Sequence, residues 1–329
     1  MNKLKVGIVG FGKIGQIRYS ILKNNPKIII NSICEKKDIK VKSKSITIYN
    51  SFRSFIKSDI DIVFISTFNQ SLSKYTLLSL QNNKHVFCEK PGAENLKDFY
   101  EIKKILKKKR LKIKYGFNHR YHESVIAAKK IIESKKYGKL VCIRGIYGKP
   151  GGIDYNLNWR NFKKFSGGGI LLDQGIHMLD LINYLSKENF FKIKSFQPKK
   201  YWNIENEDNI YAIMKSKNGV VASIHSSATQ WKHKFLLEFI FSKGYITLSG
   251  LNTPTGSYKP EKILFSNVGE LKNYKKIKEK SFTYTKDRSW DYEINEFINS
   301  ILYKKKIKNG TIDDAINTLA TIKKIYKSK

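Results

Sequence analysis

Hydrophobic runs alternate with helical patterns over the first third of the chain. The runs are rich in Ile, Val and Phe, and few polar residues interrupt them. Strands of this kind are buried on both faces, which is typical of a parallel sheet covered by helices. The pattern predicts a doubly wound α/β domain over residues 1–118. Its expected strands are Leu4–Val9, Ile28–Cys34, Ile60–Ser66, His85–Cys88 and Lys112–Phe117, with helices at Lys13–Asn24, Ser71–Gln81 and Asn95–Lys109.

The pattern changes after residue 118, where strands separated by short turns replace the buried runs. Asn218-Gly219 and Lys243-Gly244 have the composition of tight hairpin connections. We expect an open, mostly antiparallel sheet with helices on one face over residues 119–329. Its expected strands are Leu140–Tyr147, Ile210–Lys215, Val220–Ala228, Phe235–Phe241 and Tyr245–Ser249, with helices at Glu123–Ser134, Gln174–Tyr184, Trp290–Tyr303 and Ile312–Lys327.

The length of 329 residues agrees with two domains, and 41% hydrophobic residues are enough for packed cores. The formal net charge of +36 raises the alternative of a nucleic-acid binder. The basic residues are mostly lysines spread along the whole chain, which favours solvated lysine surfaces over a nucleic-acid interface. The charge would still attract anionic small molecules by long-range steering.

Cysteine usage and hydropathy indicate the compartment. Cys34, Cys88 and Cys142 are far apart and form no C-x-x-C pair, so neither a disulfide framework nor a zinc site is expected. The first apolar run is short and broken by glycine, unlike the core of a signal peptide. No window approaches the run of about 18 apolar residues that a membrane helix needs. We therefore expect a cytoplasmic protein without a membrane segment.

A glycine motif directly follows the first predicted strand and opens the first predicted helix. In such a motif the first glycine permits a tight turn, the second lets the backbone approach a pyrophosphate, and the third lets helix and strand pack closely. The helix N-terminus adds N–H donors for the anion. The sequence therefore predicts a dinucleotide site at Gly10, Phe11, Gly12, Lys13, Ile14 and Gly15.

The second predicted strand ends next to Glu35, 20 residues after Gly15. A carboxylate there can accept hydrogen bonds from the ribose hydroxyls of adenosine. Its charge disfavours the 2′-phosphate of NADP, whereas Lys36 and Lys37 would attract that phosphate, so NAD is favoured and NADP stays open. Three polar residues at the end of a neighbouring strand are further candidates for cofactor contact: Ser66, Thr67 and Asn69.

The buried strand expected at His85–Cys88 runs into Glu89, Lys90 and Pro91 at the sheet edge where the glycine motif lies. An ammonium group there can hydrogen-bond a substrate hydroxyl and stabilise developing alkoxide charge. A single lysine means little in a lysine-rich chain, but this position makes Lys90 the catalytic candidate. Glu89 and Lys90 are also expected to contact the cofactor.

A second candidate for the chemistry follows the three glycines at 167–169. Asp173, His177 and Asp180 are spaced by four and three residues, so a regular helix places them on one face. An imidazole with a pKa of about 6.5 can accept a hydroxyl proton near neutral pH. Asp173 would orient His177 or bind a second hydroxyl. A metal site on this pair is the alternative, and we expect none.

At these segments the sequence resembles the Gfo/Idh/MocA family, which includes glucose–fructose oxidoreductase and inositol dehydrogenase. The likeness runs from Val6 to about Ser249, and its most specific parts are Glu89-Lys90-Pro91 and the Asp173…His177 spacing. The resemblance implies a Rossmann domain followed by an open antiparallel sheet. It also implies hydride transfer between a nicotinamide and a ring carbon, with Lys90 catalytic and Asp173 and His177 lining the substrate pocket.

Other segments extend the resemblance. Residues 118–122 and the Trp159-Arg160 pair look like family segments near the active site, which makes Arg120, Trp159 and Arg160 candidate substrate contacts. Relatives are commonly oligomeric, so a homodimer or homotetramer is expected. One departure affects the cofactor contacts: relatives often carry Pro and His where this chain has Phe68, Gln70 and Leu72.

These observations combine into one hypothesis. His177 removes a hydroxyl proton, Lys90 stabilises the oxyanion, and both side chains meet at one nicotinamide ring. The substrate is a sugar, a nucleotide sugar or a cyclic polyol, with surface-polysaccharide metabolism as the expected setting. The alternative is a cofactor-binding regulator on the same fold, although such proteins typically lose the lysine or the histidine. Loops around 148–166 and 225–235 would set the specificity.

Overall fold

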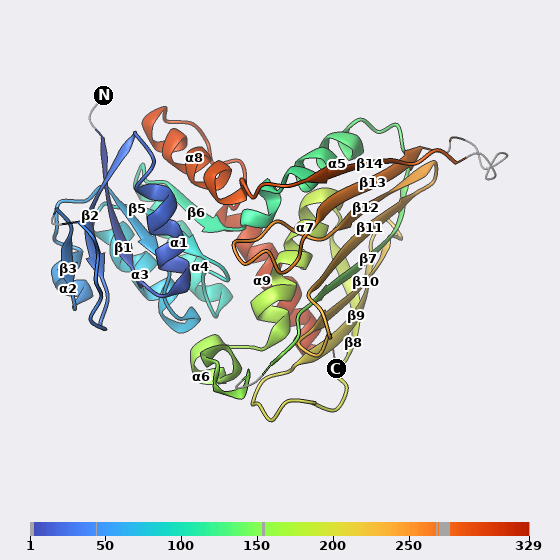
Figure 1. Ribbon diagram of the computed structural model, residues 1–329, viewed down its shortest axis with the longest axis horizontal. Coiled ribbons are helices and arrows are strands. Elements are labelled where there is room, and N and C mark those ends of the chain that lie inside the picture. Colours follow the sequence, from blue (N-terminus) through green and yellow to red (C-terminus); the bar gives the residue numbers. More distant parts are fainter. Residues whose placement is uncertain (1–2, 44, 153–154, 268, 270–276, 329) are drawn as a thin grey trace. The chain divides into compact units, whose positions relative to one another are not determined.

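The computed structural model describes residues 3–43, 45–152, 155–267, 269 and 277–328 (Figure 1). The chain forms two compact units. The first comprises Met1–Phe117 and Trp290–Asn317, and the second comprises Asn118–Ser289 and Thr318–Lys329. The change of unit at residue 117 lies next to the boundary that the hydrophobic pattern predicts. Residues 290–317 pack with the first unit, whereas the sequence pattern placed them with residues 119–329.

The first unit is built on a six-stranded, parallel sheet with the order β3-β2-β1-β4-β5-β6, which is the Rossmann order. All five predicted strands are present within a few residues. Thr47–Tyr49 was not predicted, because this short edge strand is largely exposed and carries no apolar run. The strands are β1 Leu4–Val9, β2 Ile28–Cys34, β3 Thr47–Tyr49, β4 Ile62–Ile65, β5 His85–Glu89 and β6 Ile113–Gly116, and the helices are α1 Lys13–Leu22, α2 Phe52–Phe55, α3 Asn69–Gln81 and α4 Leu96–Lys108.

Helix α8 (Ser289–Leu302) completes the core of the first unit. Its residues Ile294, Phe297 and Ile298 are fully buried in one cluster with apolar residues of β1, β2, β4 and β5. The Phe297 ring contacts Phe64 edge-on at 6.0 Å and Phe87 at 5.6 Å. Burying three large side chains stabilises the unit by several kcal/mol, at about 1.5–3 kcal/mol each. This packing explains why residues 290–317 belong with the first unit.

The second unit is built on an eight-stranded sheet with the order β14-β13-β12-β11-β7-β10-β9-β8. Among the described strands of this second sheet, only the β7–β10 pair is parallel, and the other neighbouring strands are antiparallel. Figure 1 shows α5 and α7 on the same face of this sheet, as predicted. The elements are β7 Leu140–Gly148, β8 Phe190–Phe196, β9 Asn209–Ser216, β10 Val221–Ser227, β11 Lys234–Phe241, β12 Gly244–Ser249, β13 Glu261–Asn267, β14 Lys280–Tyr284, α5 Glu123–Glu133, α6 Lys163–Ser166 and α7 Ile176–Ser186. The last helix, α9 Ile312–Lys327, is divided between the two units after Asn317.

Strands β8, β13 and β14 were not predicted from the hydrophobic pattern. Lysines interrupt the apolar residues of β8, the apolar run of β13 is only three residues long, and β14 is almost entirely exposed. Strands β9, β10 and β11 do alternate buried and exposed positions, which indicates one covered face. Of the helices that the structure describes, none is long and apolar enough to cross a membrane.

Candidate active site

The glycine loop between β1 and α1 has the geometry that a pyrophosphate site requires. Gly10 has a φ of +83°, a conformation that side chains rarely adopt. A Cβ on Gly15 would lie 2.1 Å from the Gly10 carbonyl oxygen, so only glycine lets helix and turn pack this closely. A Cβ on Gly12 would meet no described atom within 4 Å. The backbone at Gly12 is therefore open to a ligand, while the other two glycines are fixed by packing.

Glu35 connects the end of β2 to this loop. One carboxylate oxygen accepts a hydrogen bond from the Phe11 N–H at 2.7 Å. The other oxygen accepts from the backbone N–H groups of Lys36 at 2.8 Å and Lys37 at 3.3 Å. A carboxylate offers about four acceptor positions, so one remains for a ribose hydroxyl. The loop and Glu35 together fit the dinucleotide that the sequence predicts.

The residues after β4 lie beside the same loop. Val9 pairs with Ile65 in the parallel register, and a Cβ on Gly10 would lie 2.6 Å from the Ser66 carbonyl oxygen. The Ser66 Oγ is buried and finds no hydrogen-bond partner among the described residues. Thr67 accepts a hydrogen bond from Ser71 at 2.8 Å, and Asn69 begins α3. All three predicted residues thus stand at the carboxyl edge of the sheet, where cofactors bind in such folds.

Glu89 is the last residue of β5, and a buried arginine fixes it. Arg18 from α1 contacts one Glu89 oxygen with Nε at 2.8 Å and Nη2 at 2.7 Å. The same guanidinium contacts Glu293 of α8 at 2.8 Å and lies between the rings of Phe87 and Trp290, 4.4 Å from each centroid. Lys90 follows directly, half-buried, with a cis peptide bond to Pro91. We call Arg18, Glu89 and Glu293 the buried charge cluster.

Neither Arg18 nor Glu293 was predicted from the sequence. A signal for Arg18 exists, because it shares the buried stripe of α1 with Gly15 and Leu22. An arginine at a core-facing position needs a carboxylate partner. The sequence alone does not reveal which one, since Glu89 is 71 residues away.

In the second unit, Asp173, His177 and Asp180, which were predicted to share one helix face, have different neighbours. The helix begins earlier than expected, with a π-helical turn over Leu171–Gly175 that precedes α7. Asp180 is fully buried and accepts two hydrogen bonds from Arg120, at 2.8 and 2.6 Å. Arg120, a candidate substrate contact, is itself 3% exposed and lies over the Tyr184 ring. This pair holds η1 (Asn118–Tyr121) against α7, so we do not include Arg120 in the proposed site.

His177 belongs to a chain of polar rings. Its imidazole stacks on that of His119, with centroids 4.0 Å apart and planes 11° from parallel. His119 Nε2 lies 2.9 Å from the Tyr147 hydroxyl, and Nδ1 lies 3.1 Å from the Asn118 side-chain oxygen. Burial, together with Tyr258 and Asp173, raises the pKa of Tyr147 well above its usual value, so its hydroxyl stays protonated. The sequence had singled out His119 only as part of a segment.

Asp173 lies between two cations of the same unit. Lys149 Nζ is 3.1 Å from one carboxylate oxygen, and Arg160 Nε is 3.0 Å from the other. The Arg160 guanidinium rests on the Trp159 ring at 4.5 Å. Next to Asp173, Gln174 donates a hydrogen bond to the Tyr258 hydroxyl at 2.9 Å. Lys149 was missed because its partner is 24 residues further along the chain.

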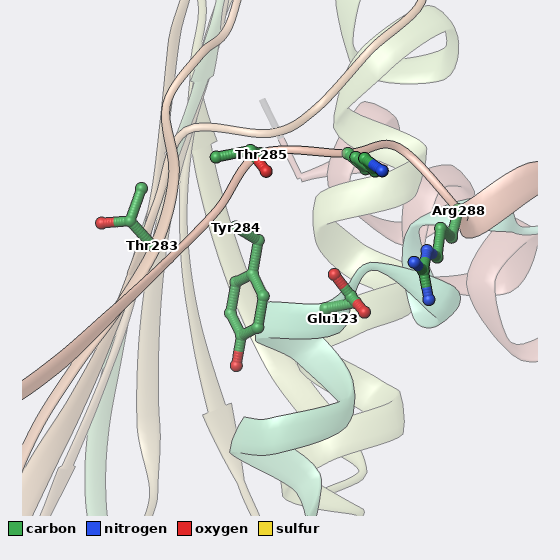
Figure 2. Close-up of a pocket in the computed structure, with 6 residues that line it drawn as sticks. Glu123, Thr283, Tyr284, Thr285 and Arg288 are labelled. Atoms are coloured by element: carbon green, nitrogen blue, oxygen red, sulfur yellow. The ribbon is translucent and has the colours of Figure 1, made fainter.

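Two further features bear on the site. Figure 2 shows a pocket lined by Glu123, Thr283, Tyr284, Thr285, Lys286 and Arg288, none of which is a predicted site residue. Within the described parts of the chain, no group of three or more His, Cys, Asp and Glu residues could hold a metal ion. Lys90 lies in the first unit and His177 in the second, and their meeting at one nicotinamide stays a prediction.

Two family models match the chain. Residues 4–117 match the oxidoreductase family with an NAD-binding Rossmann fold, and residues 125–247 match the GFO/IDH/MocA C-terminal domain. Levoglucosan dehydrogenase of Pseudarthrobacter phenanthrenivorans is 27% identical over 204 residues, which are 57% of this chain and 52% of that protein. Inositol 2-dehydrogenase/D-chiro-inositol 3-dehydrogenase of Lactiplantibacillus plantarum is 23% identical over 66% of this chain and 63% of that protein. The matched region thus spans less than two thirds of these curated relatives.

The fold is also found among solved structures. A levoglucosan dehydrogenase in complex with NADH is similar to this chain with a TM-score of 0.85 and 18% identity. The similarity covers 99% of this chain and 97% of the other, and it shows that the two share a fold. The glycine motif, the Glu89-Lys90-Pro91 segment and both family models agree. The chain belongs to the Gfo/Idh/MocA family and combines its NAD-binding Rossmann domain with its C-terminal domain.

Proposed function

We propose that this protein is an NAD-dependent dehydrogenase that oxidises a secondary alcohol of a sugar, a nucleotide sugar or a cyclic polyol. One observation carries the proposal. Lys90 follows β5 at the same sheet edge as the glycine loop, with β4 between β5 and β1. An ammonium group there stands beside the dinucleotide site, where an oxyanion would develop. The relatives named as levoglucosan and inositol dehydrogenases support the substrate class.

Bound NAD would supply the hydride acceptor, and the glycine loop and Glu35 would hold it. Lys90 donates a hydrogen bond to the substrate hydroxyl and stabilises the oxyanion as the hydride departs. His177 takes the hydroxyl proton. Its stacking on His119, which the Tyr147 hydroxyl holds at 2.9 Å, fixes the imidazole plane for this task. We propose NAD rather than NADP because Glu35 would repel a 2′-phosphate.

The test replaces Lys90 with alanine. Turnover of a panel of polyols, free sugars and nucleotide sugars is followed by the absorbance of reduced nicotinamide, with both cofactors. The Lys90→Ala variant should lose turnover by at least about 10²–10⁴-fold, the usual share of a proton-transferring group. Its NADH affinity, measured by calorimetry, should stay nearly unchanged.

The matched control is Lys97→Ala, which removes an exposed lysine from α4. It should behave as the unmodified protein does. Unchanged turnover in Lys90→Ala would refute the catalytic assignment. Stoichiometric NADH binding without oxidation of any member of the panel would instead favour the regulator.

We also propose that the protein forms a homodimer or homotetramer through the open face of the second sheet. Exposed apolar side chains share this face across β8 and β9: Phe196 is 69%, Tyr211 47% and Ile213 56% exposed. Apolar patches of this kind mark interfaces, and two sheets can pack face to face. Sedimentation of the protein as a monomer would contradict this. The free cysteines agree with a cytoplasmic setting, and a role in surface-polysaccharide metabolism remains part of the proposal.

A further inference from the structure

We propose that the substrate carries an anionic group, a carboxylate or a phosphate, and that Lys149 and Arg160 bind it. The inference rests on the proposed dehydrogenase and names the chemical class of its substrate. It starts from the position of the two cations. Lys149 directly follows β7, and Arg160 lies in the short helix η3 (Trp159–Asn161), so separate segments bring them to the same carboxylate.

The cluster of Lys149, Arg160 and Asp173 remains accessible to solvent. The side chains of Lys149 and Asp173 are 18% and 17% exposed, and that of Arg160 is 33% exposed. Such partial burial strengthens charge interactions relative to bulk water while leaving room for a ligand. Buried pairs that serve packing alone, such as Arg120 and Asp180, are 3% and 0% exposed.

The two cations have donors to spare. A guanidinium has five N–H donors and an ammonium three. Within the described residues, Arg160 side-chain contacts comprise the Nε bond to Asp173 and the Trp159 ring. The ring holds the guanidinium plane, which leaves its two terminal nitrogens as a fork. A fork of this kind matches two oxygens of a carboxylate or phosphate.

The direct contacts within the cluster favour an anion. Asp173 neutralises only one of the two cations, so the cluster carries an excess of one positive charge. The groups packed around it stay neutral near pH 7: burial and Lys149 lower the pKa of His233, and burial raises that of Tyr155 and of Tyr258.

Two other carboxylates near Tyr155 bond to backbone N–H groups, and no described ion pair joins them to Lys149 or Arg160. Asp208 accepts from the N–H groups of Tyr201 and Trp202, at 2.7 and 2.9 Å. Glu207 accepts from Gly169 and Leu171, at 3.0 and 3.1 Å, and from Tyr326 at 2.7 Å.

The cluster lies next to the groups proposed to act on the substrate. Asp173 contributes to the raised pKa of Tyr147, whose hydroxyl bonds His119, and His119 stacks on His177. A sugar whose reacting hydroxyl faces His177 can therefore place a substituent toward Lys149 and Arg160. An uncharged sugar would offer the spare donors of Lys149 and Arg160 no charged acceptor.

The experiment measures a preference ratio, which is the kcat/KM for an anionic sugar divided by the kcat/KM for the matching neutral sugar. The value of kcat/KM is determined for a hexose 6-phosphate, a hexuronate and the matching neutral hexose in the unmodified protein, Lys149→Met and Arg160→Met. Either anionic sugar should be preferred over the neutral one by the unmodified protein. Each substitution should lower that ratio about 10- to 100-fold, as expected for a charge-assisted hydrogen bond. Arg160→Lys, which keeps the charge but loses the fork, should lower it less.

The control is Lys164→Met, which removes an exposed lysine of α6 and the same unit of net charge. Its ratio should equal that of the unmodified protein. If the hexuronate is preferred the group is a carboxylate, and if the hexose 6-phosphate is preferred it is a phosphate. A preference for the neutral hexose, or equal ratios in all four variants, would overturn the inference while leaving the dehydrogenase intact.

Binding separates this inference from the proposed function. Calorimetry with the same three sugars in the presence of NADH does not require turnover. Tighter binding of an anionic sugar, weakened in Lys149→Met and Arg160→Met but not in Lys164→Met, supports the site even if no sugar is oxidised. Equal binding of charged and neutral sugars overturns it.

Discussion

Arg18 of the first unit and Arg160 of the second are held in opposite ways. In the first, Arg18 is fully buried between two aromatic rings, and it contacts two carboxylates, Glu89 and Glu293. In the second, Arg160 lies on a single ring, shares a single carboxylate with Lys149, and is one-third exposed. The Arg18 guanidinium thus contacts two carboxylates, whereas the Arg160 guanidinium has N–H donors that no carboxylate among the described residues uses.

The difference corresponds to two roles: Arg18 positions another side chain, whereas Arg160 is proposed to bind a ligand. Two carboxylates and two rings fix Arg18, so it holds Glu89 in place and with it the backbone of Lys90. Removing it would leave carboxylates buried without a partner, which is costly. Arg160 can exchange part of its contact with Asp173 for a ligand, because a partly exposed ion pair contributes less to stability than a fully buried one. Burial and the ratio of charges thus distinguish the two roles.

Arg18→Met should have the largest effect on stability. Breaking a buried ion pair costs about 3–5 kcal/mol, because Glu89 and Glu293 would lose the cation that compensates their burial. Denaturation by urea, followed by fluorescence, measures the free energy of unfolding of the first unit. A loss below about 1 kcal/mol would show that this cluster is as loosely held as a surface pair.

The effect of pH on Glu293 should come next in size. Burial, only partly offset by Arg18 and Lys114, raises the pKa of Glu293 from 4.5 to about 7. The folded state then holds a proton that the unfolded state releases. The stability from this group is therefore fully present below pH 4.5 and is lost as pH rises through 7.

Glu293→Gln should remove this decline in the free energy of unfolding with rising pH. The size of the pKa shift corresponds to a decline of about 3 kcal/mol. The measurement compares the free energy of unfolding at pH 4.5 and pH 8 in both proteins. The comparison between pH values cancels any constant cost of the substitution. An identical pH dependence in both proteins would contradict the raised pKa.

Arg160→Met should have the smallest effect on stability, below about 1 kcal/mol, because its ion pair is partly exposed. The same urea titration measures it. Together with the lowered preference for anionic sugars, a small loss would sharpen the contrast with Arg18. A loss as large as that of Arg18→Met would show that Arg160 serves the fold instead.

The sequence predicts what depends on local pattern. The five buried parallel strands and the glycine motif follow from runs and spacings within a few residues. Strand β8 escapes prediction because Lys192 and Lys194 break its apolar run, and β14 escapes it because its residues are almost entirely exposed. The π-helical turn at Leu171–Gly175 leaves no mark in the spacing, so the regular helix assumed for Asp173 and His177 was too simple.

Long-range pairing accounts for the remaining differences. The predicted residues Lys90, Asp173 and His177 were found from motifs, but Lys149 and Arg18 acquire their roles from partners that only folding brings near. The same holds for α8, whose amphipathic pattern does not reveal which core it joins. Its apolar residues fit either unit by composition, and only the packing of Phe297 against Phe64 and Phe87 assigns it.

The discontinuous first unit has a consequence for synthesis on the ribosome. Domains at the start of a chain generally fold as soon as they emerge. Here Ile294, Phe297 and Ile298 complete the hydrophobic cluster with β1, β4 and β5, and they leave the exit tunnel long after those strands. The nascent Rossmann half therefore keeps an apolar surface uncovered until α8 has been synthesised. Chaperone engagement during that interval would follow from the order of the chain.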